Sequence, residues 1–141
     1  MKNCCIYTPS EQALIEEHLT SIPHVDTIIK QSASSYLVST IESSFVMNSM
    51  PSDSIPNHIN GFIGYVYNYH THKNIEDLDD IVSYLEQVKQ VYGIVFNDEI
   101  DFESNEWLII KNIATAVEGV IFTCDSLVDP NDMVIFGPLG E

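Results

Sequence analysis

The chain has 141 residues, which is the size of one ordinary domain, and 45% of them are hydrophobic, enough to form a core. It carries 21 acidic residues against five lysines and no arginine, which gives a formal net charge of −16. Direct binding of nucleic acid requires basic side chains that neutralise phosphates, and an anionic membrane surface requires the same. We therefore expect a single domain over residues 1–141 that binds neither nucleic acid nor a membrane.

The sequence also indicates a cellular compartment. Residues 1–7 lack the apolar stretch of a signal peptide, and no segment approaches the roughly 18 apolar residues of a membrane span. The three cysteines are an odd number, and Cys4 and Cys5 are adjacent, which favours free buried thiols over a disulfide framework. Cys124 follows a similar apolar run, so we expect it to be buried as well. These features are typical of a cytoplasmic protein.

The first third of the chain predicts a strand, a helix and two more strands. Residues 3–7 are short and apolar, and residues 8–11 have the form of a helix capping box with proline at the first helical position. The apolar stripe of the following helix would consist of Leu14, Ile15, His18, Leu19 and Ile22. Two runs rich in β-branched and aromatic residues, at 25–30 and 36–47, predict the two strands.

The middle of the chain predicts two helices. Residues 57–69 fit a helix through an apolar stripe at helical spacing, with Pro56 near its first position, but alternating tyrosines also fit a strand; we favour the helix. These tyrosines are expected at the edge of the core, with an exposed recognition patch as the alternative: Tyr65, Tyr67 and Tyr69. A second helix would begin at an N-cap, Asn74, and stop at Gly93.

The last third repeats the pattern of the first. We expect a strand at 93–97, an acidic loop, a helix at 105–118 that is apolar almost all round and therefore central, and strands at 120–124 and 133–136. The whole chain then has a mixed α/β fold. Two βαββ-like halves would form a mixed sheet of about six strands, with helices packed against it.

Acidic side chains are concentrated in two segments that connect the predicted elements. The candidate partner-binding residues are Asp98, Glu99, Asp101 and Glu103 in the first set and Asp77, Asp79 and Asp80 in the second. The first set resembles a calcium loop, but it lacks the turn glycine and the ligand order of an EF-hand. We interpret both sets as acidic surface that faces solvent or a basic partner.

The sequence gives little support for enzyme activity. His70 and His72 form an HxH pair, which on a strand would share one face and could chelate a metal, but nothing fixes a third ligand. The sequence contains no phosphate loop, dinucleotide fingerprint or Gly-x-Ser-x-Gly motif. We therefore expect no enzyme activity and no cofactor, with a small metal-binding enzyme that uses His70 and His72 as one alternative.

A small, acidic α/β domain without catalytic motifs resembles the immunity proteins of bacterial toxin systems, those paired with contact-dependent or type VI secreted effectors. Segments 59–63, 93–96 and 118–122 are also similar to the front part of a widespread uncharacterised bacterial domain. The first resemblance implies that the chain binds a cognate basic toxin and occludes its active site, as a monomer or a homodimer. A nucleic-acid mimic that inhibits a DNA-binding enzyme is a second alternative.

Overall fold

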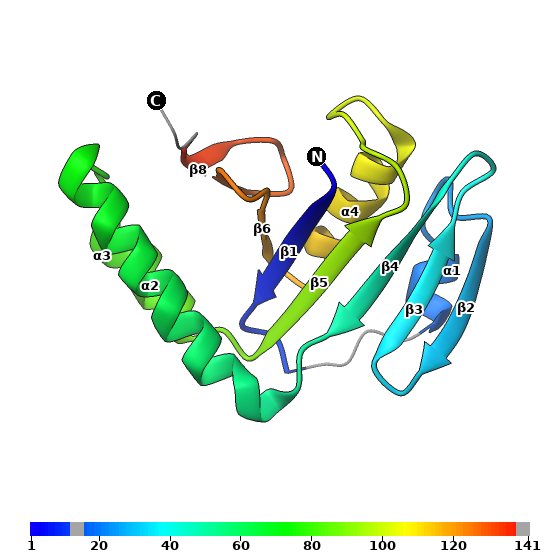
Figure 1. Ribbon diagram of the computed structural model, residues 1–141, viewed down its shortest axis with the longest axis horizontal. Helices are drawn as coiled ribbons and strands as arrows, with labels where there is room; N and C mark the ends of the chain where they lie inside the picture. Colours follow the sequence, from blue (N-terminus) through cyan, green and yellow to red (C-terminus); the bar gives the residue numbers. More distant parts are fainter. Residues whose placement is uncertain (12–15, 138–141) are drawn as a thin grey trace.

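Eight strands and four α-helices make up the part of the chain that the computed structural model describes, residues 1–11 and 16–137 without the side chains of Glu16 and His72. In chain order the elements are β1 (Asn3–Thr8), α1 (Glu16–Thr20), β2 (Thr27–Ser32), β3 (Ser35–Ser39), β4 (Ser44–Ser49), η1 (Ser52–Ser54), α2 (Ile55–His72), α3 (Leu78–Glu86), β5 (Gln90–Phe96), α4 (Asn105–Ala116), β6 (Val120–Phe122), β7 (Leu127–Val128) and β8 (Val134–Phe136). The strands form one sheet of order β2-β3-β4-β5-β1-β6-β7-β8 (Figure 1).

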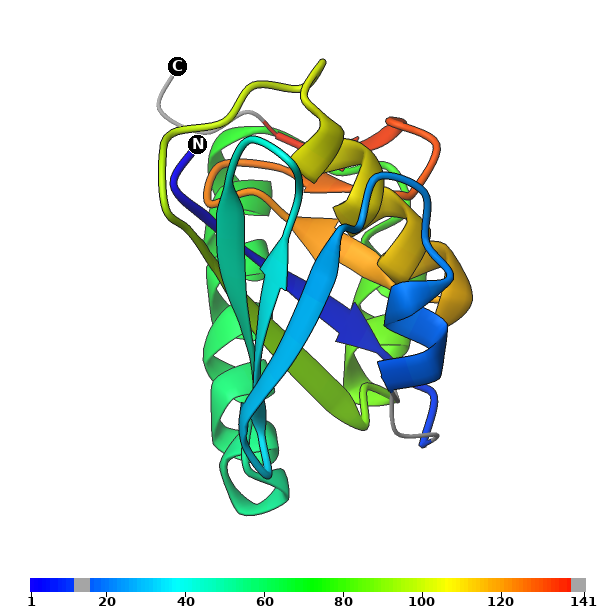
Figure 2. The ribbon, with the colours of Figure 1, turned by 90° about the vertical axis from the view of Figure 1, so that its right-hand side faces the viewer.

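The sheet lies between two helical layers, with α1 and α4 on one face and α2 and α3 on the other (Figure 2). Strand β1 packs against both helical layers because successive side chains of a strand point to opposite faces of the sheet. Ile6 packs in the cluster that contains Trp107, and the next residue, Tyr7, packs in the cluster that contains Phe62. Two cores therefore share the central strands. None of the helices in the described ranges is both long and apolar enough to cross a membrane.

The expected α/β architecture, with helices packed against a sheet, is confirmed, but the sheet differs from the expected one. It has eight strands instead of about six, and every neighbouring pair is antiparallel, so it is not mixed. The helix-linked strands β5 and β6 are not adjacent, because β1 lies between them and is antiparallel to both. Each half also has three strands after its helix, so the βαββ arrangement is not confirmed.

The segment predicted as one strand at 36–47 is a hairpin of β3 and β4. Thr40 closes its turn: the hydroxyl accepts hydrogen bonds from the backbone N–H groups of Glu42 (3.1 Å) and Ser43 (3.0 Å). Ile41, at the tip, is 91% exposed. Both Thr40 and Ile41 have high strand propensity, but the local side-chain hydrogen bonds of threonine favour the turn here.

The helical interpretation of residues 57–69 is confirmed, since α2 extends from Ile55 to His72, and the strand alternative is wrong. Pro56 stands at its start, where the missing N–H is not needed. A Cβ atom added at Gly61 or Gly64 would meet no neighbouring atom within 4 Å, so both are simply surface positions of the helix. The apolar spacing, and not the glycines or tyrosines, indicates the structure.

The bounds predicted for the next helix are wrong at both ends. The N-cap of α3 is Asp77 instead of Asn74, and the helix ends at Glu86. Gly93 does not stop a helix, because it lies inside β5 and pairs with Cys5 and with a residue of β4. Two residues after the C-cap Gln87, the Lys89 N–H donates to the carbonyl of the β1 residue Thr8 (2.9 Å), next to the start of β5.

The start of the first predicted helix, with Leu14 and Ile15, falls on residues 12–15, which lie outside the described residues. Thr8, expected in a capping box, ends β1; its hydroxyl donates to the Val117 carbonyl and accepts from the Ser10 N–H (3.0 Å).

Helix α4 fills the core as the sequence predicts. Ser104 caps it by accepting a hydrogen bond from the Trp107 N–H (3.2 Å), and Ile110 is fully buried. The link to β6 requires Gly119, because a Cβ there would lie 2.8 Å from the Tyr7 carbonyl oxygen. The link between α4 and β6 is thus in close backbone contact with the central strand β1.

Truncation of the α4 core side chain should destabilise the fold strongly. Ile110→Ala removes a fully buried side chain and should lower the free energy of unfolding by about 2–5 kcal/mol in urea titrations. Leu108→Ala, on the exposed side of the same helix, is the matched control and should cost less than about 1 kcal/mol. Equal losses in the two variants would contradict the assignment of the buried face.

Tyr84 gives a pH-dependent prediction. Its hydroxyl donates to the Glu118 carbonyl (3.2 Å), and burial, with a smaller effect of the nearby Glu118, raises its pKa to about 12. The tyrosine of the unfolded chain ionises near pH 10, so the stability that the neutral Tyr84 hydroxyl contributes should be constant below pH 10 and be lost as the pH rises toward 12. Tyr84→Phe should make this alkaline decline shallower in urea titrations at several pH values. An unchanged slope would contradict the assignment.

Candidate functional site

Three acidic segments lie at one end of the sheet, the end where β1 begins and β5 finishes (Figure 1). They are the β5–α4 loop at 97–104, the segment 123–133 around β7, and the connection 73–80 before α3. The predicted residues of the first and third segments are all exposed: Asp98, Glu99, Asp101, Glu103, Asp77, Asp79 and Asp80. Segments 97–104 and 73–80 lie on opposite sides of the molecule in Figure 1, so the structure does not bring the two predicted sets together.

The β5–α4 loop is held in place by the N-terminal end of β1. The Ile100 N–H donates to the Met1 carbonyl (2.9 Å), and the Ile100 side chain is buried. Asp101 accepts the N–H of Glu103 (2.8 Å) in an Asx turn, which leads into the helix cap at Ser104. The loop therefore presents its carboxylates from a defined backbone.

Phe102 stands in the middle of these carboxylates and is 60% exposed. One edge contacts Trp107 in a T-shaped arrangement, with ring centroids 5.1 Å apart. The indole N–H of Trp107 donates to Asp132 Oδ1 (2.9 Å), and Lys111 Nζ donates to Asp132 Oδ2 (2.7 Å). The hydrogen bond from Lys111 is the main cause that lowers the pKa of Asp132; desolvation opposes it, and the bond from Trp107 and the charge of Lys111 add smaller lowering effects. These contacts join α4 to the β7–β8 turn.

A cleft of about 460 Å³ opens between the β5–α4 loop and the strands β6 to β8. Its lining residues are Phe102, Trp107, Thr123, Asp125, Ser126, Val128, Asp132 and Val134. Trp107 and Val128 are buried, whereas Phe102 and Val134 are exposed at its edge, and Met133 is exposed next to Val134. An apolar cleft with carboxylates at its rim is suited to a ligand that is both apolar and cationic.

Sequence reasoning identifies the carboxylates but misses the cleft. Phe102 is recognisable in principle, since it is an aromatic residue flanked by charges in a loop where no core stripe accounts for it. The sequence places Val134 in a strand but does not indicate its exposure. The cleft forms because the β7–β8 turn lies beside α4. These segments are distant in the sequence, so no local pattern predicts the contact.

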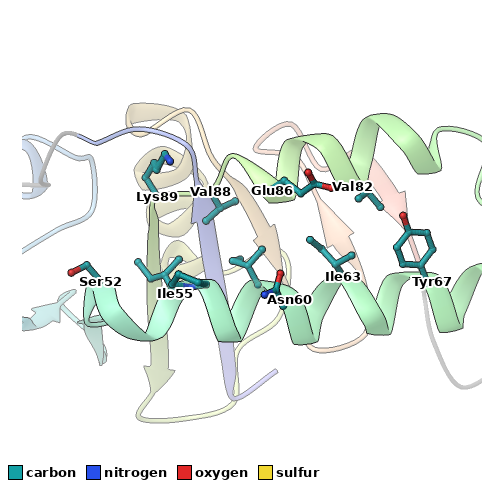
Figure 3. Close-up of a pocket in the computed structure, with 11 residues that line it drawn as sticks. Ser52, Ile55, Asn60, Ile63, Tyr67, Val82, Glu86, Val88 and Lys89 are labelled. Carbon is teal, nitrogen blue, oxygen red and sulfur yellow. The ribbon is translucent and has the colours of Figure 1, made fainter.

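A larger groove of about 650 Å³ lies between α2 and the segment from α3 to β5 (Figure 3). Isoleucines and valines line it, and Figure 3 shows Glu86 and Lys89 along the side opposite α2. Its charges are balanced, and it contains none of the predicted site residues. Tyr67, at one end, is exposed, but Tyr65 packs against Phe122. The tyrosines of α2 therefore do not form a joint recognition patch.

The histidine pair lies in the last turn of α2, so the strand geometry that a chelating HxH pair needs is absent at this place. His70 Nδ1 accepts the Ile75 N–H (3.0 Å), which orders the connection to α3. Within residues 1–11 and 16–137, no group of three or more His, Cys, Asp or Glu side chains is placed to hold a metal ion.

The three cysteines are free. Burial is the main cause that raises the pKa of the Cys4 thiol. Burial also raises the pKa of the half-buried Cys5 thiol, with a smaller effect of the nearby Cys124. The expectation of buried thiols is confirmed for Cys4, but Cys124 is exposed because it lies beyond the end of β6, with a φ of 78°.

No family model matches this chain, and comparisons with curated proteins and with solved structures give no match either.

The Asp132 contacts give a prediction in acid. Because its pKa is lowered in the folded state, the stability from these contacts is present above the unfolded pKa, near 3.8, and is lost as the pH falls through the lower folded pKa. The emission of Trp107, the single tryptophan, should report this protonation. Lys111→Met should move the fluorescence midpoint upward toward 3.8, and an unmoved midpoint would contradict the pairing.

Proposed function

We propose that this chain is an immunity-type protein that binds a cognate basic bacterial toxin in the cytoplasm and neutralises it by covering its active site. The observation that carries the proposal is the exposed acidic surface formed by the β5–α4 loop and the neighbouring segment 123–133, in a chain of net charge −16. Self-repulsion of this size opposes compact folding, so an acidic surface beyond the needs of solubility favours a role in recognition.

Electrostatic complementarity explains how such a surface acts. Opposite potentials accelerate encounter and orient two proteins before contact, and they discriminate against partners of like charge. The β5–α4 loop supplies Asp98, Glu99, Asp101 and Glu103 on a backbone that hydrogen bonds hold, so little ordering is needed on binding. We propose this loop and the neighbouring segment 123–133 as the main contact surface.

The second predicted set takes a different role in this proposal. Asp77, Asp79 and Asp80 stand at the start of α3, where they also interact favourably with the helix dipole. Since they lie on the far side of the molecule from the β5–α4 loop in Figure 1, they steer the approaching partner instead of meeting it in the same contact.

Two alternatives make different demands. A nucleic-acid mimic needs carboxylates spaced like phosphates, to fill a groove that binds DNA. The exposed apolar residues Phe102, Met133 and Val134 lie among the acidic segments and favour a partner surface with apolar contacts over such a groove. A metal enzyme based on His70 and His72 needs a third ligand, which the described residues do not supply.

A homodimer would form through the exposed edge strand β2, and light scattering distinguishes it from a monomer.

The test uses the product of the neighbouring gene, because toxin and immunity genes are usually adjacent. The two proteins should form a complex at low salt, and the complex should abolish the activity of the partner. A variant with the amides Asp98→Asn, Glu99→Gln, Asp101→Asn and Glu103→Gln should lower the association rate constant about tenfold or more in stopped-flow measurements.

The matched control removes four exposed charges elsewhere in the chain: Glu17→Gln, Asp53→Asn, Glu86→Gln and Glu118→Gln. It changes net charge by the same amount, so it should alter the rate constant by only about twofold if location matters. Absence of a complex at low salt, or equal effects of the two variants, would contradict the proposal.

A further inference from the structure

The cleft beside the β5–α4 loop combines two kinds of wall. Phe102 and Val134 are 60% and 57% exposed at its edge, while Trp107 and Val128 form a buried apolar floor. Exposed apolar side chains gathered at a cleft are typical of an interaction site, because their burial by a partner releases ordered water. An apolar occupant would therefore gain contact area here.

The two carboxylates of the cleft differ in whether a cation already pairs with them. Asp132 is already bound by the Lys111 ammonium (2.7 Å) and the Trp107 indole N–H. Asp125 is exposed and accepts a hydrogen bond from the neutral hydroxyl of Thr123 (3.0 Å), which leaves its negative charge uncompensated by that contact. The rim thus offers an anionic group next to an open aromatic ring.

We propose that this cleft receives an arginine side chain of the basic partner, with the guanidinium between the Phe102 ring and the Asp125 carboxylate. A guanidinium stacks on aromatic faces and binds a carboxylate with two parallel hydrogen bonds, which a lysine ammonium does not do. Its aliphatic stem would lie along Val134. This inference rests on the proposed function for the identity of the protein that carries the arginine.

The occupant cannot be a second copy of this chain. The chain contains no arginine, and two copies would each bring a net charge of −16. A neutral apolar ligand would leave Asp125 without compensation for lost water contacts. The composition of the chain and the chemistry of the cleft therefore favour an arginine from another protein.

The probe is a tripeptide, N-acetyl-Gly-Arg-Gly-amide, compared with the same peptide carrying citrulline, which is neutral and nearly isosteric. Binding is followed by ¹⁵N–¹H NMR shifts and by the emission of Trp107. The arginine peptide should bind saturably with a Kd in the range of about a millimolar, shift the amides around Phe102, Asp125 and Val134, and exceed the citrulline peptide about tenfold in affinity.

Phe102→Ala and Asp125→Asn should each weaken binding of the arginine peptide about twofold to fivefold. Two controls lie outside the cleft lining: Leu108→Ala, an exposed apolar residue of α4, and Asp53→Asn, an exposed carboxylate of η1. Both should leave the Kd within about twofold if the contacts are specific. Equal binding of citrulline, shifts confined to other surfaces, or equal effects of Asp53→Asn and Asp125→Asn would overturn the inference.

The outcome separates this inference from the proposed function. If the neighbouring-gene product binds but the arginine peptide does not shift the cleft amides, the cleft assignment is wrong and the proposed function stands. If the arginine peptide binds in the cleft and the neighbouring-gene product does not, the cleft assignment stands and the proposed function is wrong.

Discussion

Strand β1 pairs with β5 on one side and with β6 on the other, and this insertion holds together the sheet, the two cores and the acidic loop. This strand is antiparallel to both neighbours, and its alternating side chains enter both cores, with Ile6 on the α4 face and Tyr7 on the α2 face. The backbone that precedes it also fixes the acidic loop, because the Met1 carbonyl accepts the Ile100 N–H. The pairing that completes the sheet thus also positions the candidate site.

Placement of the acidic residues at one end of the sheet has a physical cost that the fold tolerates. Like charges in exposed loops are screened by water and salt, so their repulsion is weaker than it would be on packed helices and strands. Two of these carboxylates are paired directly: the Met1 ammonium contacts Glu99 Oε1 (3.3 Å), and Lys111 and Trp107 bind Asp132. The Asp132 contacts join α4 to the β7–β8 turn. The same turn forms one wall of the cleft, so its attachment to α4 determines the shape of the site.

Local patterns in the sequence predict the elements better than their arrangement. The apolar spacing around Ile110 and Val66 indicates α4 and α2, because helix stripes depend on neighbours a few residues away. The order of the strands depends on pairing between distant segments, so the position of β1 between β5 and β6 leaves no local signal. Thr40 misleads the strand assignment because its turn arises from side-chain hydrogen bonds. The exposed carboxylates are recognisable in sequence, but the cleft beside Phe102 requires the fold.

We propose that the acidic end of the sheet, at the β5–α4 loop and segment 123–133, is the surface that meets a basic protein partner. Hydrogen–deuterium exchange of the complex with the neighbouring-gene product tests it most directly, because protection maps the contact without any substitution. We expect slower exchange at 97–104 and 123–134, and unchanged exchange at the groove between α2 and the segment from α3 to β5. Protection confined to that groove, or to the open edge at β2, would contradict it.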